Sequence, residues 1–205
     1  MATTPTQTES VDTTNFAKFQ TGNPVVRRLI GNFYEKVGSI VGSLDSGSVL
    51  DAGCGEGESL SRLAPVLPAK QSGIDLNPES VEFTSARVPE ADIAVGDITA
   101  MPFEDGAFDL VLCLEVLEHL PVPGLALEEI ARVSARDIVI SVPHEPWFRL
   151  GSLARGNYVK TWGNHPEHVN HWNHRSLRSF LEEKVDVVTL EGSMPWLVAH
   201  CRTRA

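Results

Sequence analysis

The sequence carries little positive charge. Its 205 residues include 17 lysines and arginines against 27 aspartates and glutamates, which gives a formal net charge of −10 at pH 7. A protein that follows a phosphate backbone needs an excess of basic side chains. We therefore expect no nucleic-acid partner, although the composition leaves a local basic patch open.

Long apolar runs are also missing. No stretch of the sequence is apolar over the length needed to cross a bilayer. Residues 1–15 are rich in Thr and Ser and lack the apolar core of a signal peptide. We therefore expect a cytoplasmic protein that does not insert into a membrane.

Cysteine is scarce. The three cysteines, at positions 54, 113 and 201, are odd in number and widely spaced, so they form neither a disulfide framework nor a metal-binding motif. This use of cysteine fits a reducing compartment, with each thiol acting as a small buried side chain.

The most informative segment is residues 47–57, which read Gly-Ser-Val-Leu-Asp-Ala-Gly-Cys-Gly-Glu-Gly. A short apolar strand runs into a glycine turn, and a segment compatible with a helix follows, an arrangement that lets backbone approach a nucleotide-like ligand. The dinucleotide fingerprint would place its third glycine at position 58, where this chain has Glu58. Carboxylates at Asp51, Glu56 and Glu58 would repel a pyrophosphate and tolerate a sulfonium cation, which favours S-adenosylmethionine.

Acidic residues also follow the next two expected strands. Asp75 ends a strand over 72–76, near the spacing at which a carboxylate meets ribose hydroxyls, and Asp97 ends a strand over 92–98. A near-continuous apolar run over 108–114 is typical of a buried parallel strand. The alternative interpretation is that Asp75 simply caps the end of its strand.

Together these four elements resemble the class I S-adenosylmethionine-dependent methyltransferases over residues 45–145. The resemblance implies that Asp97 binds the adenine amino group and that the amide of Ile98 reads a ring nitrogen. The predicted cofactor-binding residues are Asp51, Gly53, Gly55, Gly57, Asp75, Leu76, Asp97, Ile98 and Leu114.

The order of elements predicts an α/β fold. Apolar residues spaced by three and four mark a helix over 24–44, and five strand–helix alternations follow through residue 142. The resemblance adds a Rossmann-like, mostly parallel seven-stranded sheet with helices on both faces and an antiparallel edge strand. One domain is expected, with a flexible tail at 1–20, an N-terminal helix within 21–44, a cofactor-binding core at 45–142, a substrate-facing lid at 143–175, and a C-terminal helix and strands at 176–205.

The long irregular segment over 143–175 should choose the substrate, because ligands of open α/β sheets bind beyond the carboxyl ends of the strands. It contains five of the seven histidines and three tryptophans. Such side chains suit a hydroxyl-rich or planar acceptor, and they equally suit a packed lid. The candidate substrate residues are Glu145, Trp147, Tyr158, Trp162, His165, His168 and Trp172.

Two histidines are candidates for the catalytic base. His144 directly follows the fifth expected strand, and His119 follows the fourth strand beside Glu118. Histidine can remove a proton from a hydroxyl near neutral pH as the bond to the methyl carbon forms. For either histidine alone, a structural hydrogen-bonding role is as reasonable as catalysis.

A metal site is a further hypothesis. The histidines at 165, 168, 171 and 174 permit a zinc site by number. Alternatively, a divalent ion such as magnesium could polarise a sugar diol, with candidate ligands Glu118, His144, Glu145 and Glu167. The simpler interpretation is a lid braced by the amides of neighbouring asparagines.

The leading functional prediction is O-methylation of a sugar or glycan-type small molecule. The segment over 141–147 and the histidine-rich segment over 163–172 resemble small bacterial methyltransferases that modify glycans or lipid-linked sugars. The alternatives are N- or C-methylation of another metabolite, such as a quinone-like aromatic, and a non-catalytic adenosyl-ligand sensor. The sequence does not indicate an oligomeric state.

Overall fold

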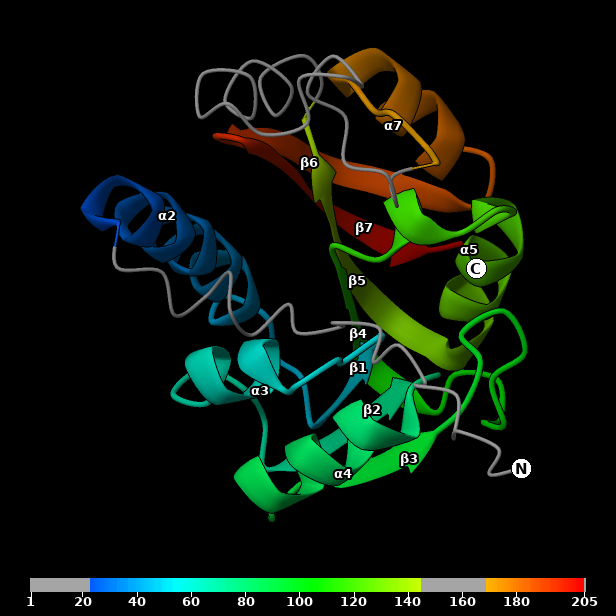
Figure 1. The fold of residues 1–205 in the computed structure, drawn as a ribbon. Helices are drawn as coiled ribbons and strands as arrows, with labels where there is room; N and C mark the ends of the chain where they lie inside the picture. The colour runs from blue at the N-terminus through cyan, green and yellow to red at the C-terminus, as the bar shows by residue number, and fades with distance from the viewer. Residues whose placement is uncertain (1–22, 145–168, 205) are drawn as a thin grey trace, which may run out of the picture.

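The computed structural model describes residues 23–144 and 169–204. They form a seven-stranded sheet with the order β3-β2-β1-β4-β5-β7-β6 (Figure 1). The strands are β1 (Ser48–Ala52), β2 (Lys70–Asp75), β3 (Asp92–Val95), β4 (Phe108–Leu114), β5 (Ser134–Pro143), β6 (Val185–Ser193) and β7 (Trp196–Thr203). The helices are α2 (Pro24–Val41), α3 (Glu58–Leu63), α4 (Pro78–Arg87), the short 3₁₀ helix η1 (Leu117–His119), α5 (Pro123–Val133) and α7 (His174–Leu181).

Strands β1 to β5 pair in parallel, whereas β7 pairs antiparallel with both β5 and β6. Helices α2 and α3 cover one face of the sheet, and α5 and α7 cover the other (Figure 1). This arrangement confirms the predicted Rossmann-like fold with helices on both faces and an antiparallel strand at one side.

The apolar run of β4 explains its central place. Side chains of this strand alternate between the two core clusters, because Leu110 and Leu112 pack toward α2 and Val111 and Cys113 pack toward α5. A strand buried on both faces must be apolar at nearly every position. The three cysteines are all buried with free thiols, as predicted.

The expectation of five strand–helix alternations was wrong at one connection. The segment between β3 and β4, residues 96–107, contains no helix. Instead, the side chain of Arg132 on α5 donates to the carbonyl oxygens of Met101 and Phe103 at 3.0 and 2.6 Å. These hydrogen bonds satisfy backbone groups that a helix would otherwise pair.

Element boundaries also differ from the expected ones by a few residues. Helix α2 ends at Val41 rather than at residue 44, because its chain turns at Gly42. Strand β3 ends at Val95, before the acidic residue that was expected within it. Within the described residues, no helix has the length and apolar character of a membrane span.

Candidate active site

The carboxyl ends of the parallel strands β1, β2 and β4 lie side by side at the same end of the sheet. The chain runs from β1 outward to β2 and β3 and then returns to β4 on the other side of β1. Ligands of open α/β sheets bind at such a reversal of strand order. The glycine turn that follows β1 lies at this point.

The glycine turn depends on the absence of side chains. Gly53 and Gly57 have positive φ angles of 84° and 73°. A Cβ atom on Gly53 would lie 2.6 Å from Val116, and one on Gly57 would lie 2.7 Å from Thr84. The turn is therefore packed against the segment after β4 on one side and against α4 on the other.

Gly55 differs from its two neighbours. A Cβ built there would meet no heavy atom of the described residues within 4 Å, although its φ is also positive at 49°. The backbone is thus accessible at the middle of the turn. The hydroxyl of Thr84 on α4 fixes this position by donating a hydrogen bond to the carbonyl oxygen of Gly55 at 2.6 Å.

Asp75 joins the end of β2 to the glycine turn. Its Oδ2 accepts a hydrogen bond from the amide of Gly55 at 2.8 Å, and its Oδ1 accepts one from Asn77 at 2.9 Å. A carboxylate offers about four acceptor sites, so it has the capacity to accept from a ribose diol as well. Leu76 beside it is 70% exposed, as expected of a side chain that could cover a bound ring.

Asp51 is the most unusual polar residue of the site. It is 1% exposed, and neither carboxylate oxygen has a hydrogen-bond partner among the described residues. Burial, together with the negative charge of Asp75, raises the pKa of Asp51 to about 7. A buried, uncompensated carboxylate is what a cationic ligand would pair with, so the site fits S-adenosylmethionine, which carries a sulfonium and an ammonium group.

The structure corrects one step of the sequence argument. Glu58 does not face the ligand side of the turn with an uncompensated charge, because it forms ion pairs with Arg62 and with Arg87, the latter at 2.8 Å. Arg87 also donates to the carbonyl oxygen of Glu56. The carboxylates that disfavour a pyrophosphate are therefore Asp51 and Asp75 rather than Glu58.

The expected adenine residues follow β3. Asp97 is exposed, and its Oδ1 accepts hydrogen bonds from the amide and hydroxyl of Thr99 at 2.8 and 2.7 Å, which lower the pKa of the carboxyl group. Ile98 is 6% exposed, and Leu114 at the end of β4 is buried as well. Asp97 therefore stands ionised at the outer end of the predicted cofactor site.

His144 lies at the carboxyl end of β5. Its amide donates to the carbonyl oxygen of Pro195 at 2.8 Å, and its ring meets that of His174 edge to face with 5.1 Å between centroids. Burial and the charge of His174 lower the pKa of His144 below its ordinary value. The imidazole is thus kept neutral at pH 7, the state in which it can accept a proton.

His119 and Glu118 lie in the 3₁₀ helix after β4. Glu118 is buried, and its Oε1 is 3.9 Å from Nε2 of His119. The carbonyl oxygen of Glu118 accepts hydrogen bonds from the amides of Val169 and Asn170. This segment therefore joins the end of β4 to the chain that enters α7.

Of the predicted substrate residues, only Trp172 lies within the described residues. It is 9% exposed, packs on Phe180 with 4.8 Å between ring centroids, and pairs with His144 in an isolated bridge. Its indole nitrogen has no hydrogen-bond partner among the described residues. Glu145, Trp147, Tyr158, Trp162, His165 and His168 lie outside the described residues.

Two of the four hypothetical metal ligands, Glu145 and Glu167, also lie outside the described residues. Over 23–144 and 169–204, no group of three histidine, cysteine or carboxylate side chains is arranged to hold a metal ion.

Two residues near the candidate site, Glu115 and His174, are absent from the predicted site residues. Glu115 has a positive φ of 61° and accepts a hydrogen bond from Ser141 at 2.9 Å. The position of Glu115 directly after a buried strand could have marked it as a candidate. From the sequence, His174 is only one of the four histidines at 165, 168, 171 and 174. Residue spacing does not show that the chain brings His174 to His144.

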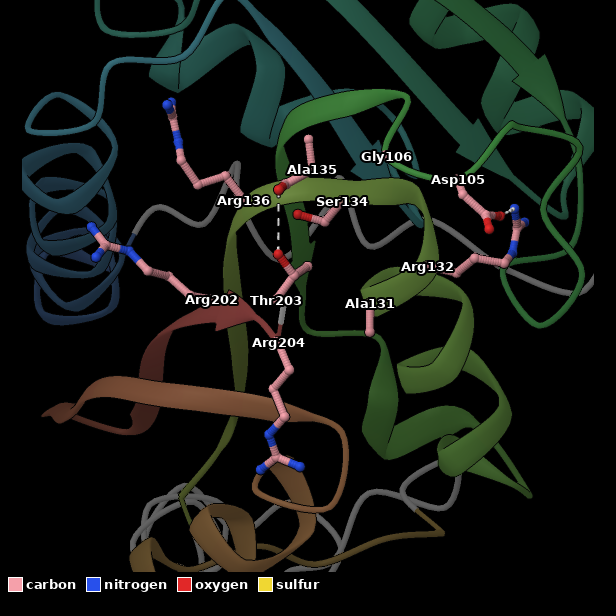
Figure 2. A pocket seen from close by; sticks show the side chains of 10 residues that line it. All are labelled: Asp105, Gly106, Ala131, Arg132, Ser134, Ala135, Arg136, Arg202, Thr203 and Arg204. Atoms are coloured by element: carbon pink, nitrogen blue, oxygen red, sulfur yellow. Dashed lines mark hydrogen bonds and ion pairs between the residues drawn. The ribbon is translucent and has the colours of Figure 1, made fainter.

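A separate cavity of about 540 Å³ lies at the opposite, amino-terminal edge of β5. Figure 2 shows that the guanidinium groups around it point in different directions. Arg132 and Arg204 are each bound to carboxylates and carbonyl oxygens of neighbouring turns. The cavity therefore lacks converging donors and is not a second candidate site.

The fold is the one defined by known methyltransferases. Magnesium protoporphyrin IX methyltransferase from Synechocystis PCC 6803, solved with bound SAH, superimposes with a TM-score of 0.68 at 19% identity, covering 92% of each chain. Residues 50–140 match the family model described as a methyltransferase domain. This part of the chain is therefore similar to a methyltransferase domain, and the fold around it is one that methyltransferases adopt.

Several curated proteins similar to this chain are named as methyltransferases. Chloroplastic tocopherol O-methyltransferase of Arabidopsis thaliana is 30% identical over 151 residues, which are 63% of this chain and 43% of that protein. Ajmaline N-methyltransferase of Rauvolfia serpentina is 35% identical over 101 residues, covering 46% of this chain and 35% of that protein. The chain thus spans less than half the length of these relatives.

Proposed function

We propose that this chain transfers the methyl group of S-adenosylmethionine to a hydroxyl of a small, hydroxyl-rich acceptor of the sugar or glycan type. The core at 45–142 binds the cofactor, and the segment over 143–175 contacts the acceptor. That segment resembles small bacterial methyltransferases of glycans and lipid-linked sugars. Among these, the mannoside 1-O-methyltransferases make mannosides the first acceptors to test.

The position and environment of His144 carry the proposal. His144 follows β5 at the carboxyl end of the sheet, its backbone amide is held by the carbonyl oxygen of Pro195, and its ring packs on that of His174. The lowered pKa keeps the ring neutral at pH 7. A neutral imidazole can take the hydroxyl proton. His119, 3.9 Å from Glu118, is the second candidate for this role.

The chain's own residues then have distinct tasks. Asp75 accepts hydrogen bonds from the ribose hydroxyls, Asp97 and Ile98 hold the adenine ring, and Asp51 compensates positive charge. When bound, the sulfonium supplies the methyl group and is released as a neutral thioether. As the carbon–oxygen bond forms and the carbon–sulfur bond breaks, His144 takes the acceptor proton, so that charge and atoms balance. Orientation of the acceptor supplies most of the rate enhancement in such a transfer.

N-methylation is the second candidate, because a relative matched over 46% of this chain is named as an N-methyltransferase. Two further alternatives are C-methylation of a quinone-like aromatic and a non-catalytic role as a sensor that binds the cofactor without turnover. A divalent ion such as magnesium, held by Glu118 and His144 with Glu145 and Glu167, stays a separate hypothesis, and no step above depends on it.

The test is transfer of labelled methyl groups to three acceptor panels: mannose and methyl mannosides, phenols and quinols, and secondary amines. We expect labelling of the first panel by the wild type and a loss of about 100-fold or more in turnover for His144→Ala. His171→Ala changes an exposed histidine of the same segment and shows whether the loss is specific to His144. Labelling of amines alone would overturn O-methylation, and cofactor binding without labelling of any panel would favour the sensor.

A further inference from the structure

Glu115 has an unusual backbone conformation. Within the described residues, it is the only non-glycine residue with a positive φ, at 61°. L-residues adopt the left-handed region at a free-energy cost, and such a conformation persists only where the surrounding structure imposes it. Strain of this kind often marks a functional position.

Ser141 on β5 imposes this conformation through three contacts. The amide of Glu115 donates to both the carbonyl oxygen and the hydroxyl oxygen of Ser141, each at 3.1 Å. The Ser141 hydroxyl in turn donates to Oε1 of Glu115 at 2.9 Å. Because Ser141 is fully buried, this one side chain fixes both the backbone and the carboxylate of Glu115.

The strand order brings Glu115 to the same end of the sheet as the predicted cofactor residues. Asp97 follows β3 and Asp75 ends β2, so the residues predicted to hold the adenine and the ribose lie on that side of β1. Neighbouring strands are about 4.8 Å apart, so a cofactor held by these residues would bring its sulfonium group toward the glycine turn and β4. Glu115 is the first residue after β4, and Val116 beside it packs against Gly53 of the turn.

Negative charge gathers at this end of β4. The pKa of the buried Cys113 thiol is raised first by burial and then by the charges of Glu118, Asp51 and Glu115. These three carboxylates therefore act on one point at the carboxyl end of the strand. A cationic group of a ligand would be stabilised there, whereas a neutral group would not.

We propose that Glu115, held by the positioning residue Ser141, makes the site prefer the charged sulfonium cofactor to its neutral thioether product. This inference rests on the proposed function, and it adds a specificity-determining residue to it. The carboxylate attracts the sulfonium charge before transfer, and this attraction disappears when the methyl group has left. The pair would thereby favour release of the product.

Calorimetry with S-adenosylmethionine and S-adenosylhomocysteine tests the proposal without an acceptor. For Glu115→Gln, which keeps the size of the side chain, we expect about tenfold weaker binding of the sulfonium compound and less than about twofold change for the thioether. Ser141→Ala should produce a smaller loss of about threefold, again confined to the sulfonium compound. Equal losses for both compounds would overturn the proposal.

The double variant separates positioning from simple structural support. If Ser141 acts through Glu115, then Ser141→Ala should cause no additional loss in a Glu115→Gln background. Fully additive losses would overturn the positioning role. Failure of either compound to bind the wild type would instead refute the proposed function itself.

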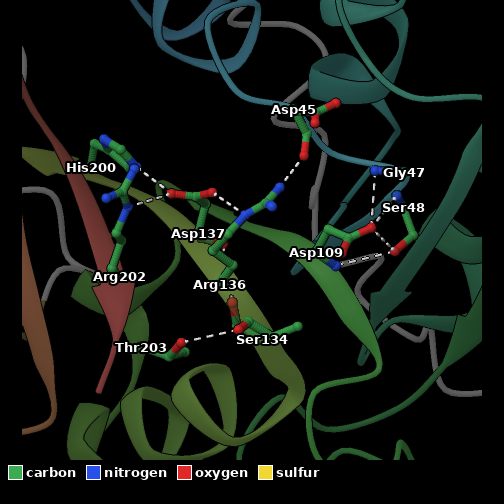
Figure 3. A network of polar contacts seen from close by, with 11 residues as sticks. Asp45, Gly47, Ser48, Asp109, Ser134, Arg136, Asp137, His200, Arg202 and Thr203 are labelled. Carbon is green, nitrogen blue, oxygen red and sulfur yellow. Dashed lines mark hydrogen bonds and ion pairs between the residues drawn. The ribbon is translucent and has the colours of Figure 1, made fainter. Parts of the chain in front are cut away.

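A matched control exists at the opposite end of the same strand. The hydroxyl of Ser48 donates to the carboxylate of Asp109 at 3.1 Å and accepts from its amide at 3.1 Å, at the amino-terminal end of β4 (Figure 3). Ser48→Ala therefore removes a similar serine–carboxylate pair far from the ligand edge. We expect it to lower the midpoint of urea unfolding and to leave the ratio of the two dissociation constants unchanged.

Discussion

Replacing Asp51 by asparagine should make the free protein more stable at neutral pH. The wild-type carboxyl group is buried, has no hydrogen-bond partner among the described residues, and has a pKa raised from 3.8 to about 7 by burial and by Asp75. A tenfold change in an ionisation equilibrium corresponds to about 1.4 kcal/mol. Ionising Asp51 in the folded state therefore costs up to about 4 kcal/mol relative to the unfolded chain.

The sign of the pH dependence follows from this raised pKa. Between pH 4 and pH 7 the folded state retains a proton on Asp51 that the unfolded state has lost, so the stability of the wild type falls as pH rises through this range. The amide of the Asp51→Asn variant would not titrate. The stability difference between the variant and the wild type should therefore grow by about 2 kcal/mol between pH 5 and pH 7 and then level off.

Urea unfolding of both proteins at half-unit steps from pH 5 to pH 8 measures this difference directly. Titrating groups that do not interact with Asp51 are shared, so their contributions cancel when the two curves are subtracted. The constant offset also contains the exchange of one buried polar group for another, which is why the slope and not the absolute value is compared. Curves that stay parallel from pH 5 to pH 8 would refute the assignment of a raised pKa to Asp51.

Three further outcomes are expected from the same edge of the sheet. Asp75→Ala should weaken cofactor binding by about 1–3 kcal/mol through the loss of charge-assisted hydrogen bonds; calorimetry would detect this, and an unchanged dissociation constant would remove the ribose assignment. Gly57→Ala should lower both stability and cofactor affinity, because its Cβ would lie 2.7 Å from Thr84 at a positive φ; an unaltered unfolding midpoint would contradict this packing. Prolonged treatment with EDTA should abolish turnover, and magnesium restore it, only if a divalent ion assists; persistent activity would leave the histidine series structural.

Local sequence signals predicted the parts of the fold that are determined locally. The glycine turn after residues 48–52 needs positive φ angles, and glycine is the residue that adopts them readily. The apolar run over 108–114 predicted β4 with its observed bounds, because a strand buried on both faces has little freedom in composition. At these positions the backbone conformation or burial restricts which residue types are tolerated. The residue type therefore predicts the local structure.

Features that depend on long-range pairing could not be predicted in the same way. The charge of Glu58 is compensated by Arg87, a residue on a different helix, so its carboxylate was wrongly counted against phosphate binding. The helix expected between β3 and β4 is replaced by hydrogen bonds from Arg132 on α5. In each case a side chain distant in sequence pairs with a charge or a backbone group. Residue spacing does not predict such a contact.

The buried carboxylate after β1 links the stability of the protein to its ligand. A group that costs up to about 4 kcal/mol when ionised in the free protein is a poor choice for stability alone. The cost is offset only by a ligand whose positive charge reaches Asp51, and that ligand would lower the pKa of the carboxyl group as it binds. Binding of S-adenosylmethionine should therefore strengthen as pH rises toward 7 in the wild type, and it should lose this pH dependence in Asp51→Asn. A phosphate-bearing dinucleotide would show the opposite trend, because ionisation of Asp51 would repel it.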